Sequence, residues 1–311
     1  GEGLEHGRVQ NREHGRGPSD AQGQGQEGDQ GEPGAPHQGP EGEVDVLAKA
    51  GAAPPGEPTG GDVATIRGGQ GMDRFTILSS PFGQLTLDGG EDPDSYTVQF
   101  GRLAGRIRVV DAGRSSGDSL SLRGTEFAEQ IELTGGGRKS WTAKWEGPDL
   151  NATGNEIAIE TIEIAHEGLE FAEVDAGAGD DVIDASAIRR GLATQLVLRG
   201  GDGNDEIRGS RGADVLLGGA GDDFLLGLGG RDLLIGGTGA DLLVGHHGDD
   251  ILIAGTTSYD AHDQALLGIL AEWTSTRNYQ QRVANLTDGS GSPDRLNGSV
   301  FLNARTVRDD G

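Results

Sequence analysis

The chain has 311 residues, with 58 Gly, 11 Pro and no Cys, and its 51 acidic residues outnumber its 25 basic residues, giving a formal net charge of -26. The lack of cysteine excludes disulfide frameworks, thiolate metal sites and thiol nucleophiles. Only 33% of the residues are hydrophobic and 4% aromatic, so one large conventional core is not expected. The negative charge repels phosphate backbones, which argues against nucleic acid as a partner and favours a cation.

The N-terminal segment is poor in apolar residues. Leu4 and Val9 are the only large aliphatics in residues 1–43, where Gly, Glu, Gln and Pro dominate. Such a segment cannot offset the entropy lost on ordering, so we expect a disordered low-complexity arm over residues 1–60. Residue 1 is Gly with no apolar leader, which is typical of a fragment or a processed end. No stretch has the roughly 18 to 20 continuous apolar residues of a transmembrane segment.

Residues 61–173 contain short alternating apolar runs between Gly-rich and Asp-rich turns, which predict short strands. The runs are QLTL at 84–87, YTVQF at 96–100, RIRVV at 106–110 and EIAIETIEI at 156–164. The nonapeptide GGQGMDRFT at 68–76 and a weaker echo, GGEDPDSYT at 89–97, indicate successive coils. We therefore expect a degenerate β-solenoid in this region.

A strict repeat follows. Residues 200–253 divide into six nonapeptides, each with Gly at positions 1 and 4, Asp at position 6 and an aliphatic residue at position 8. A seventh unit, AGAGDDVID at 176–184, precedes a 15-residue insertion at 185–199. Self-similarity at a fixed short period is the mark of a solenoid.

These nonapeptides resemble the RTX (repeats-in-toxin, haemolysin-type) calcium-binding repeat of secreted bacterial proteins. The resemblance implies an all-β fold, a parallel β-roll with two units per coil, over residues 174–255. Turns would then stack every 18 residues. The units at 200, 218 and 236 begin Gly-Gly, whereas those at 209, 227 and 245 begin Gly followed by Ser, Leu or His, which predicts two distinct edges.

The repeat chemistry suits calcium. Glycine adopts positive φ at little cost, which lets backbone carbonyls converge, and Ca²⁺ takes about six to eight oxygen ligands. Carboxylates and carbonyls of two stacked turns can supply this shell, and we estimate about four ions in the strict array. The predicted carboxylate ligands are Asp205, Asp214, Asp223, Asp232, Asp241 and Asp250, then Asp181, with Asp73 as a further candidate. The alternative is that these residues only form Asx turns.

Calcium should also control folding. Stacked carboxylates without a cation place like charges side by side, which opposes folding. We therefore predict folding coupled to calcium binding. The resemblance implies that this lets an unfolded chain leave the cytoplasm and fold outside.

The strand residues predict two further features. Position 8 should point into the roll, because side chains alternate along a strand. Positions 7 and 9 then face outward, and from the second unit on they are also apolar, so the outer face should pack on something.

The tail, residues 256–311, is the candidate partner for that face. Leu266, Ile269, Leu270 and Trp273 form one face of an amphipathic helix after a cap at Ser258 or Asp260. A weaker helix with Tyr279, Val283 and Leu286 and a strand within 299–307 complete a small α+β cap. A partner-binding or membrane-surface helix is the alternative, although its polar face lacks basic residues.

No catalytic constellation emerges, so the chain is not expected to be an enzyme. Residues 113–117 match Gly-x-Ser-x-Gly but lead into a strand rather than a helix. His246 and His247 occupy variable turn positions.

The favoured function is a secreted, extracellular or cell-surface calcium-binding structural or adhesive bacterial segment, with surface proteins or polysaccharide open as partners. The alternative is the secretion and folding module of an exoenzyme, a protease or lipase, whose catalytic domain lies outside this chain.

Overall fold

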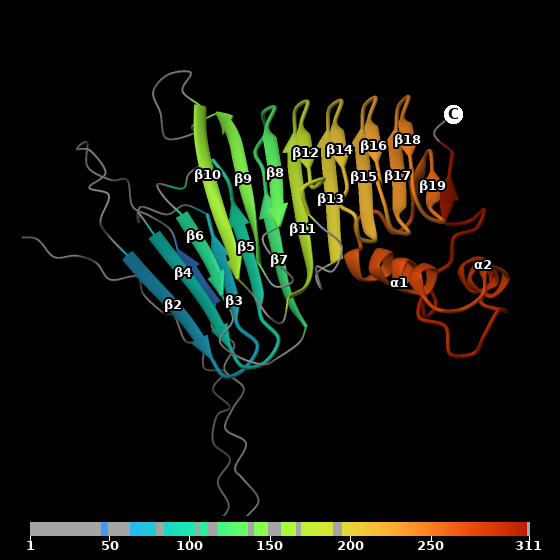
Figure 1. Cartoon of the computed structure of the whole chain (residues 1–311), viewed down its shortest axis with the longest axis horizontal. Coiled ribbons are helices and arrows are strands. Elements are labelled where there is room, and N and C mark those ends of the chain that lie inside the picture. Colours follow the sequence, from blue (N-terminus) through green and yellow to red (C-terminus); the bar gives the residue numbers. More distant parts are fainter. Residues whose placement is uncertain are drawn as a thin grey trace, which may run out of the picture.

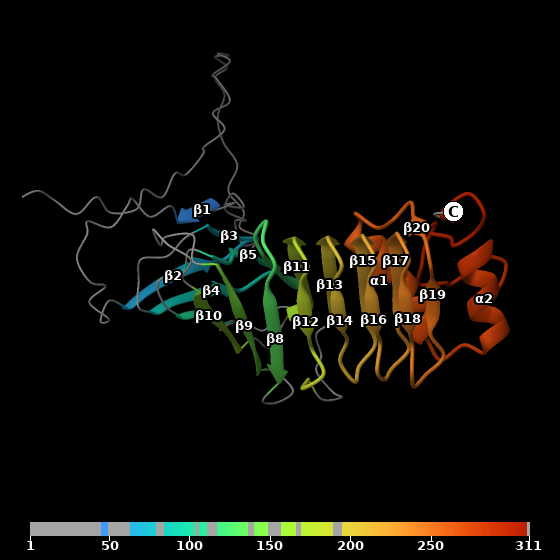
Figure 2. The ribbon, with the colours of Figure 1, turned by 90° about the horizontal axis from the view of Figure 1, so that it is seen from above.

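The computed structural model describes residues 45–48, 63–78, 84–101, 103, 106–110, 117–135, 140–148, 157–165, 169–188 and 195–309. Most of the predicted N-terminal arm, residues 1–60, lies outside the described residues. The described strands form two long sheets that run side by side along the molecule (Figure 1, Figure 2).

Sheet A, as described, is entirely parallel and has the strand order β1-β3-β5-β7-β11-β13-β15-β17-β19. Its strands are β1 (Asp45–Ala48), β3 (Arg74–Ile77), β5 (Ser95–Gln99), β7 (Asp118–Arg123), β11 (Leu169–Ala178), β13 (Gln195–Asp202), β15 (Asp214–Ala220), β17 (Leu233–Thr238) and β19 (Ile251–Ile253).

Sheet B has the order β18-β16-β14-β12-β8-β9-β10-β6-β4-β2. Its strands are β2 (Val63–Gly69), β4 (Gln84–Gly90), β6 (Arg106–Val110), β8 (Gln130–Gly135), β9 (Ser140–Pro148), β10 (Ile157–Ala165), β12 (Val182–Asp184), β14 (Glu206–Arg208), β16 (Phe224–Leu226) and β18 (Leu242–Val244).

Consecutive strands of the repeat region alternate between the sheets, which is the coil of a parallel β-roll. In sheet A the register steps by 18 residues, from Val215 to Leu233 to Ile251. The turns that begin Gly-Gly all lead into sheet B, and the others lead into sheet A. The predicted all-β fold with two distinct edges is therefore confirmed.

The interior of the roll is lined by position 8 of the repeats. Ile207, Leu216, Leu225 and Leu234 are fully buried. Leu252, by contrast, is 47% exposed, so the predicted inward position does not bury it. The reason is that β19 is the outermost strand of sheet A as described, with no further coil stacked on it.

The predicted strands of residues 61–173 are confirmed as β4, β5, β6 and β10. β-structure begins before the predicted boundary at residue 60, because β1 pairs with β3 and places Val46 opposite Phe75. The predicted insertion at 185–199 is also shorter than expected. Residues 195–199 form the first part of β13 and pair with β11.

A wedge of two extra strands interrupts the parallel stacking. Between β6 and β12, sheet B contains β10, β9 and β8, whereas sheet A contains only β11 between β7 and β13. β9 runs antiparallel to both of its neighbours, so the degenerate region is not one continuous parallel solenoid. Two strands add about 10 Å to one sheet. Figure 1 shows β2, β4 and β6 inclined relative to β14, β16 and β18.

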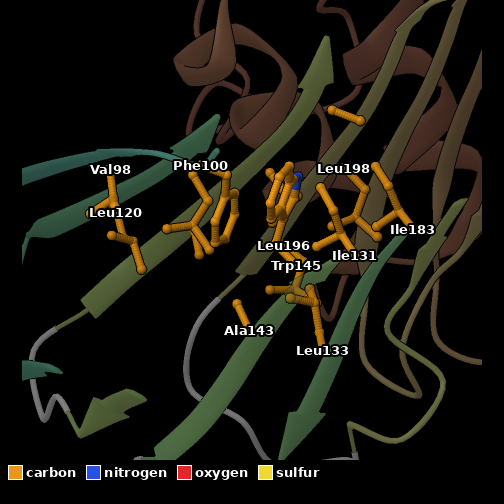
Figure 3. Close-up of a cluster of buried hydrophobic side chains, with 14 of the residues drawn as sticks. Val98, Phe100, Leu120, Ile131, Leu133, Ala143, Trp145, Ile183, Leu196 and Leu198 are labelled. Carbon is orange, nitrogen blue, oxygen red and sulfur yellow. The ribbon is translucent and has the colours of Figure 1, made fainter. Parts of the chain in front are cut away.

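Aromatic residues fill the interior at the wedge (Figure 3). Trp145 on β9 is fully buried and stacks on Phe100, with ring centroids 5.8 Å apart. Ala143, two residues earlier on β9, is also fully buried. The antiparallel strand thus keeps the alternation that points every second side chain inward, and one core continues from the degenerate region into the roll.

Two helices, α1 (Asp263–Thr274) and α2 (Tyr279–Thr287), form the predicted cap beside β13 to β19 (Figure 1). The apolar face of α1 covers the outer face of sheet A as predicted. The apolar residues in this contact include Val215, Leu217, Leu233, Ile235 and Ile253 of the sheet and Leu266, Ile269, Leu270 and Trp273 of α1. On sheet B, in contrast, the outward Leu242 is 58% exposed.

Two predicted details of the tail are wrong. The residue before α1 is His262, without a side-chain cap, because the Asp260 carboxylate instead accepts a hydrogen bond from the Thr257 N–H at 2.8 Å. The predicted strand within 299–307 reduces to β21 (Val307–Arg308), which pairs with β20 (Thr256–Thr257).

Arginines fix both ends of α1. At its start, the Arg199 guanidinium binds the Asp263 carboxylate and the Asp260 carbonyl. Beyond its end, Arg282 is buried over the Trp273 ring at 4.6 Å and pairs with Asp249 at 3.2 Å. In the described part of the chain, no helix is long and apolar enough to cross a membrane.

Candidate metal sites between stacked turns

The aspartates at position 6 of the turns form ladders along the two edges of the roll. We call the turns that lead into sheet B edge B and those that lead into sheet A edge A. On edge B the N–H of Asp181 donates to Oδ1 of Asp205 at 2.9 Å, and the N–H of Asp205 donates to Oδ1 of Asp223 at 2.8 Å. Asp223 continues to Asp241 at 2.9 Å. Each carboxylate is therefore held by the turn before it.

Edge A carries the same kind of ladder in two separate parts. The N–H of Asp214 donates to Asp232, and that of Asp232 donates to Asp250, both at 3.0 Å. In the degenerate region the N–H of Asp73 donates to Asp94 at 2.8 Å. The eight predicted ligands therefore occupy equivalent rungs. Asp181, Asp205, Asp223 and Asp241 lie on edge B, and Asp73, Asp214, Asp232 and Asp250 lie on edge A.

The second carboxylate oxygen lies over the glycine at position 1. A Cβ on Gly218 would lie 2.2 Å from Oδ2 of Asp223 and 2.5 Å from the carbonyl oxygen of Gly236 in the next turn. A Cβ on Gly227 would similarly approach Oδ2 of Asp232 at 2.6 Å. Only glycine leaves room for these two oxygens, so position 1 is fixed by the geometry of the site.

These oxygens are buried and unsatisfied. Oδ2 of Asp181, Asp205, Asp223 and Asp232 has no hydrogen-bond partner, and the four residues are at most 2% exposed. A buried carboxylate oxygen without a partner is costly. It is the hard ligand that calcium prefers, and it projects beside a backbone carbonyl.

The pKa values of these carboxyl groups reflect their burial. Desolvation, together with the charges of neighbouring carboxylates, raises the pKa of Asp181 and Asp232 to about 8 and that of Asp205 to about 7. Asp223 is raised to about 6 by the same causes. A bound divalent cation would oppose this shift, because it favours the charged form.

Asp214 differs from the other rungs. Its carboxylate accepts hydrogen bonds from the Ser210 N–H at 2.6 Å and from the Ser210 hydroxyl at 2.8 Å. Burial raises its pKa to about 6, while these bonds lower it. Ser210 stands at position 2, where edge B turns of the strict repeat have glycine, so a side chain here occupies the oxygen that elsewhere is unpartnered.

Side chains at position 2 also strain the rest of edge A. Leu228 and His246 have φ of 70° and 75°, in the left-handed region that costs a non-glycine residue roughly 1–2 kcal/mol. His246 and His247 are exposed and contact each other edge to face. Within the described residues no three His, Cys, Asp or Glu side chains gather around one point. The oxygens here come as one carboxylate per turn together with backbone carbonyls.

Sequence reasoning missed three rungs, Asp94, Asp118 and Glu129. Asp94 is at position 6 of the echo at 89–97, and its N–H donates to Oδ1 of Asp118 at 2.6 Å. Asp118 follows the Gly-x-Ser-x-Gly match, so that segment leads into a ladder rung. The signal was Gly followed five residues later by an acidic residue. Coil lengths of 21 and 24 residues hid it from a search at period 18.

Comparison with known families locates the repeats. A family model described as the RTX calcium-binding nonapeptide repeat, in four copies, matches residues 173–187, 199–234 and 226–256. A second model, the T4-like virus tail tube protein gp19, matches residues 124–170, the segment around the wedge. No curated protein and no solved structure gives a significant match. The chain is therefore an RTX repeat protein over residues 173–256, and these repeats bind calcium ions.

Proposed function

We propose that this chain is a structural or adhesive segment of a secreted bacterial protein, in which calcium binding between stacked turns drives folding of the roll. RTX repeats are typical of secreted bacterial proteins. The observation that carries the proposal is the row of buried, unpartnered carboxylate oxygens at Asp181, Asp205, Asp223 and Asp232.

The energetic argument has two steps. Folding without a cation buries carboxylates that repel one another along each edge, a cost that the extended unfolded chain does not have. The paired turns exist only in the folded roll, so an ion that binds them stabilises the folded state alone. At a calcium concentration one hundred times Kd, each site contributes about 2.7 kcal/mol. Several such sites exceed the usual margin between folded and unfolded states.

The direct test is a calcium titration of the metal-stripped chain, followed by circular dichroism and thermal unfolding. Calcium should increase the strand signal and raise Tm, whereas magnesium at equal concentration should not, because it demands a tighter octahedral shell. A double variant, Asp205→Asn with Asp223→Asn, should respond much less. If the metal-stripped chain is already fully folded and calcium leaves Tm unchanged, the coupling is refuted and the aspartates act as turn formers.

A further inference from the structure

A turn outside the matched repeats has the same construction as the calcium-binding turns. Residues 124–129, Gly-Thr-Glu-Phe-Ala-Glu, precede β8 and carry Gly at position 1 and an acidic residue at position 6. The acidic residue is Glu129 rather than Asp, and the family match begins only at residue 173.

This turn stacks directly on the turn of residues 176–181. The Glu129 N–H donates to Oδ1 of Asp181 at 2.7 Å, the rung geometry of edge B. The N–H of Ala178 donates to the carbonyl of Thr125 at 3.1 Å. The two turns are adjacent although Glu129 and Asp181 are 52 residues apart in the chain, because the strands of the wedge intervene in sequence.

The oxygens of the turn are placed as in the repeats. A Cβ on Gly124 would lie 2.3 Å from Oε2 of Glu129 and 2.0 Å from the carbonyl oxygen of Ala176. These two atoms correspond to the carboxylate and carbonyl oxygens that converge over Gly218 in the strict array. Glu129 is only 4% exposed, and its Oε2 has no hydrogen-bond partner.

The additional methylene of glutamate is accommodated locally. Oε1 of Glu129 accepts a hydrogen bond from the Thr125 N–H of its own turn at 2.7 Å. This bond folds the side chain back over the turn and leaves Oε2 beside the Ala176 carbonyl. A Glu can therefore fill the place of the repeat Asp without displacing the neighbouring turn.

We propose that a divalent cation of the calcium class binds between the turns 124–129 and 176–181, with the Glu129 carboxylate and the Ala176 carbonyl as ligands. Asp181 of the next turn brings a second negative charge to the same place. The ion joins the strand that begins the wedge, β8, to the first coil of the RTX region. This site lies beyond the matched repeats and does not require that their folding be coupled to calcium.

Trp145 provides a local reporter for this site. It lies opposite Ile131 across β8 and β9, and its indole lies within interaction distance of the Glu129 carboxylate. Terbium is a calcium analogue whose luminescence is excited through a nearby tryptophan. In the full chain, excitation of tryptophan should give terbium emission that Trp145→Phe reduces and that excess calcium displaces. Equilibrium dialysis counts the bound calcium independently.

Glu129→Gln tests the ligand, because it keeps the shape of the side chain and removes its charge. We expect loss of the Trp145-dependent emission and one fewer bound calcium. Glu126→Gln is the matched control, since Glu126 is exposed in the same turn, and it should behave as the unmodified chain does. Glu129→Asp supplies the residue of the other rungs and should retain the ion.

The outcomes separate binding at this turn from binding by the array. If Glu129→Gln retains both the Trp145-dependent emission and the calcium count of Glu126→Gln, the proposal is overturned. It is also overturned if Glu129→Asp loses the ion as fully as Glu129→Gln does, because the role of Glu129 would then be structural. If the array at 200–253 failed to bind calcium, the count would fall in every variant, while the emission would still depend on Glu129.

Discussion

Edge A and edge B are built from the same nonapeptide, yet different interactions hold their turns together. Edge B has an unbroken ladder from Glu129 to Asp241 and glycine at position 2 of its strict turns. Edge A has Ser210, Leu228 and His246 at that position. The comparison teaches that position 2 decides how fully a turn relies on an ion.

Edge A also has protein groups that act where edge B has none. Ser210 satisfies Asp214, and Arg231 and Arg282 both pair with Asp249 in the last turn. The Trp273 indole donates to the carbonyl of Asp249. The cap thus ties down the end of edge A with bonds that need no calcium, and edge B should depend on calcium more strongly.

Asparagine substitutions should give the largest effect and separate the edges. Asp223→Asn keeps the hydrogen bond from Asp205 but weakens an ion ligand, so in calcium it should cost about 2–3 kcal/mol, the contribution of one filled site. In calcium-free buffer the same change should stabilise the roll, because it removes a buried charge. Thermal unfolding with and without calcium measures both signs.

Asp214→Asn is the matched comparison on edge A. Its carboxylate is already bound to Ser210, so its cost should depend much less on calcium than that of Asp223→Asn. Equal calcium dependence of the two variants would contradict the proposed difference between the edges.

Removing the arginine of the cap should have an intermediate effect with no calcium dependence. Arg282→Gln loses a hydrogen bond to the Trp273 carbonyl at 2.7 Å and the pair with Asp249, at a cost of about 2 kcal/mol. The decrease in Tm should be the same with calcium and with chelator. Arg211→Gln, at an exposed position of the same edge, is the control. A decrease confined to calcium would mean that the cap acts through the ion sites.

Acidification should stabilise the metal-free roll. The pKa of Asp181 and Asp232 is about 8 in the folded chain against an ordinary value of 3.8, so the folded state binds more protons than the unfolded state between these values. Stability therefore rises as the pH falls from about 8 toward 4, and it is lost as the pH rises through the folded pKa. Tm in calcium-free buffer should be higher at pH 5 than at pH 8. A flat profile would indicate that these carboxyl groups are not buried in the metal-free chain.

The smallest effect should come from relieving strain on edge A. Leu228→Gly removes a side chain from a left-handed conformation and should stabilise the folded chain by roughly 1 kcal/mol. Gly219→Ala, at the equivalent position of edge B, should destabilise it, because the new Cβ would lie 2.0 Å from the Gly201 carbonyl oxygen. Chemical denaturation in saturating calcium compares them. Destabilisation by Leu228→Gly would indicate that its side chain contributes more than the strain costs.

The strict array could be predicted from sequence because its signals are local and periodic. Asp205 and Asp223 recur at 18 residues, and Leu266, Ile269 and Trp273 define a helix face without reference to the rest of the fold. The wedge could not be predicted, because the pairing of β10 with β6 departs from chain order. Glu129 was missed for the same reason, since its neighbouring rung lies 52 residues away.

The wedge also fixes the outline of the molecule. Two additional strands in sheet B alone lengthen one side of the solenoid by about 10 Å, so the coils before and after it cannot share one axis. The protein is therefore an elbow rather than a rod, with sheet A on the inside of the bend and the α1 cap on that inner side. Adding or removing repeats would change the length of one arm and leave the angle between the arms unchanged.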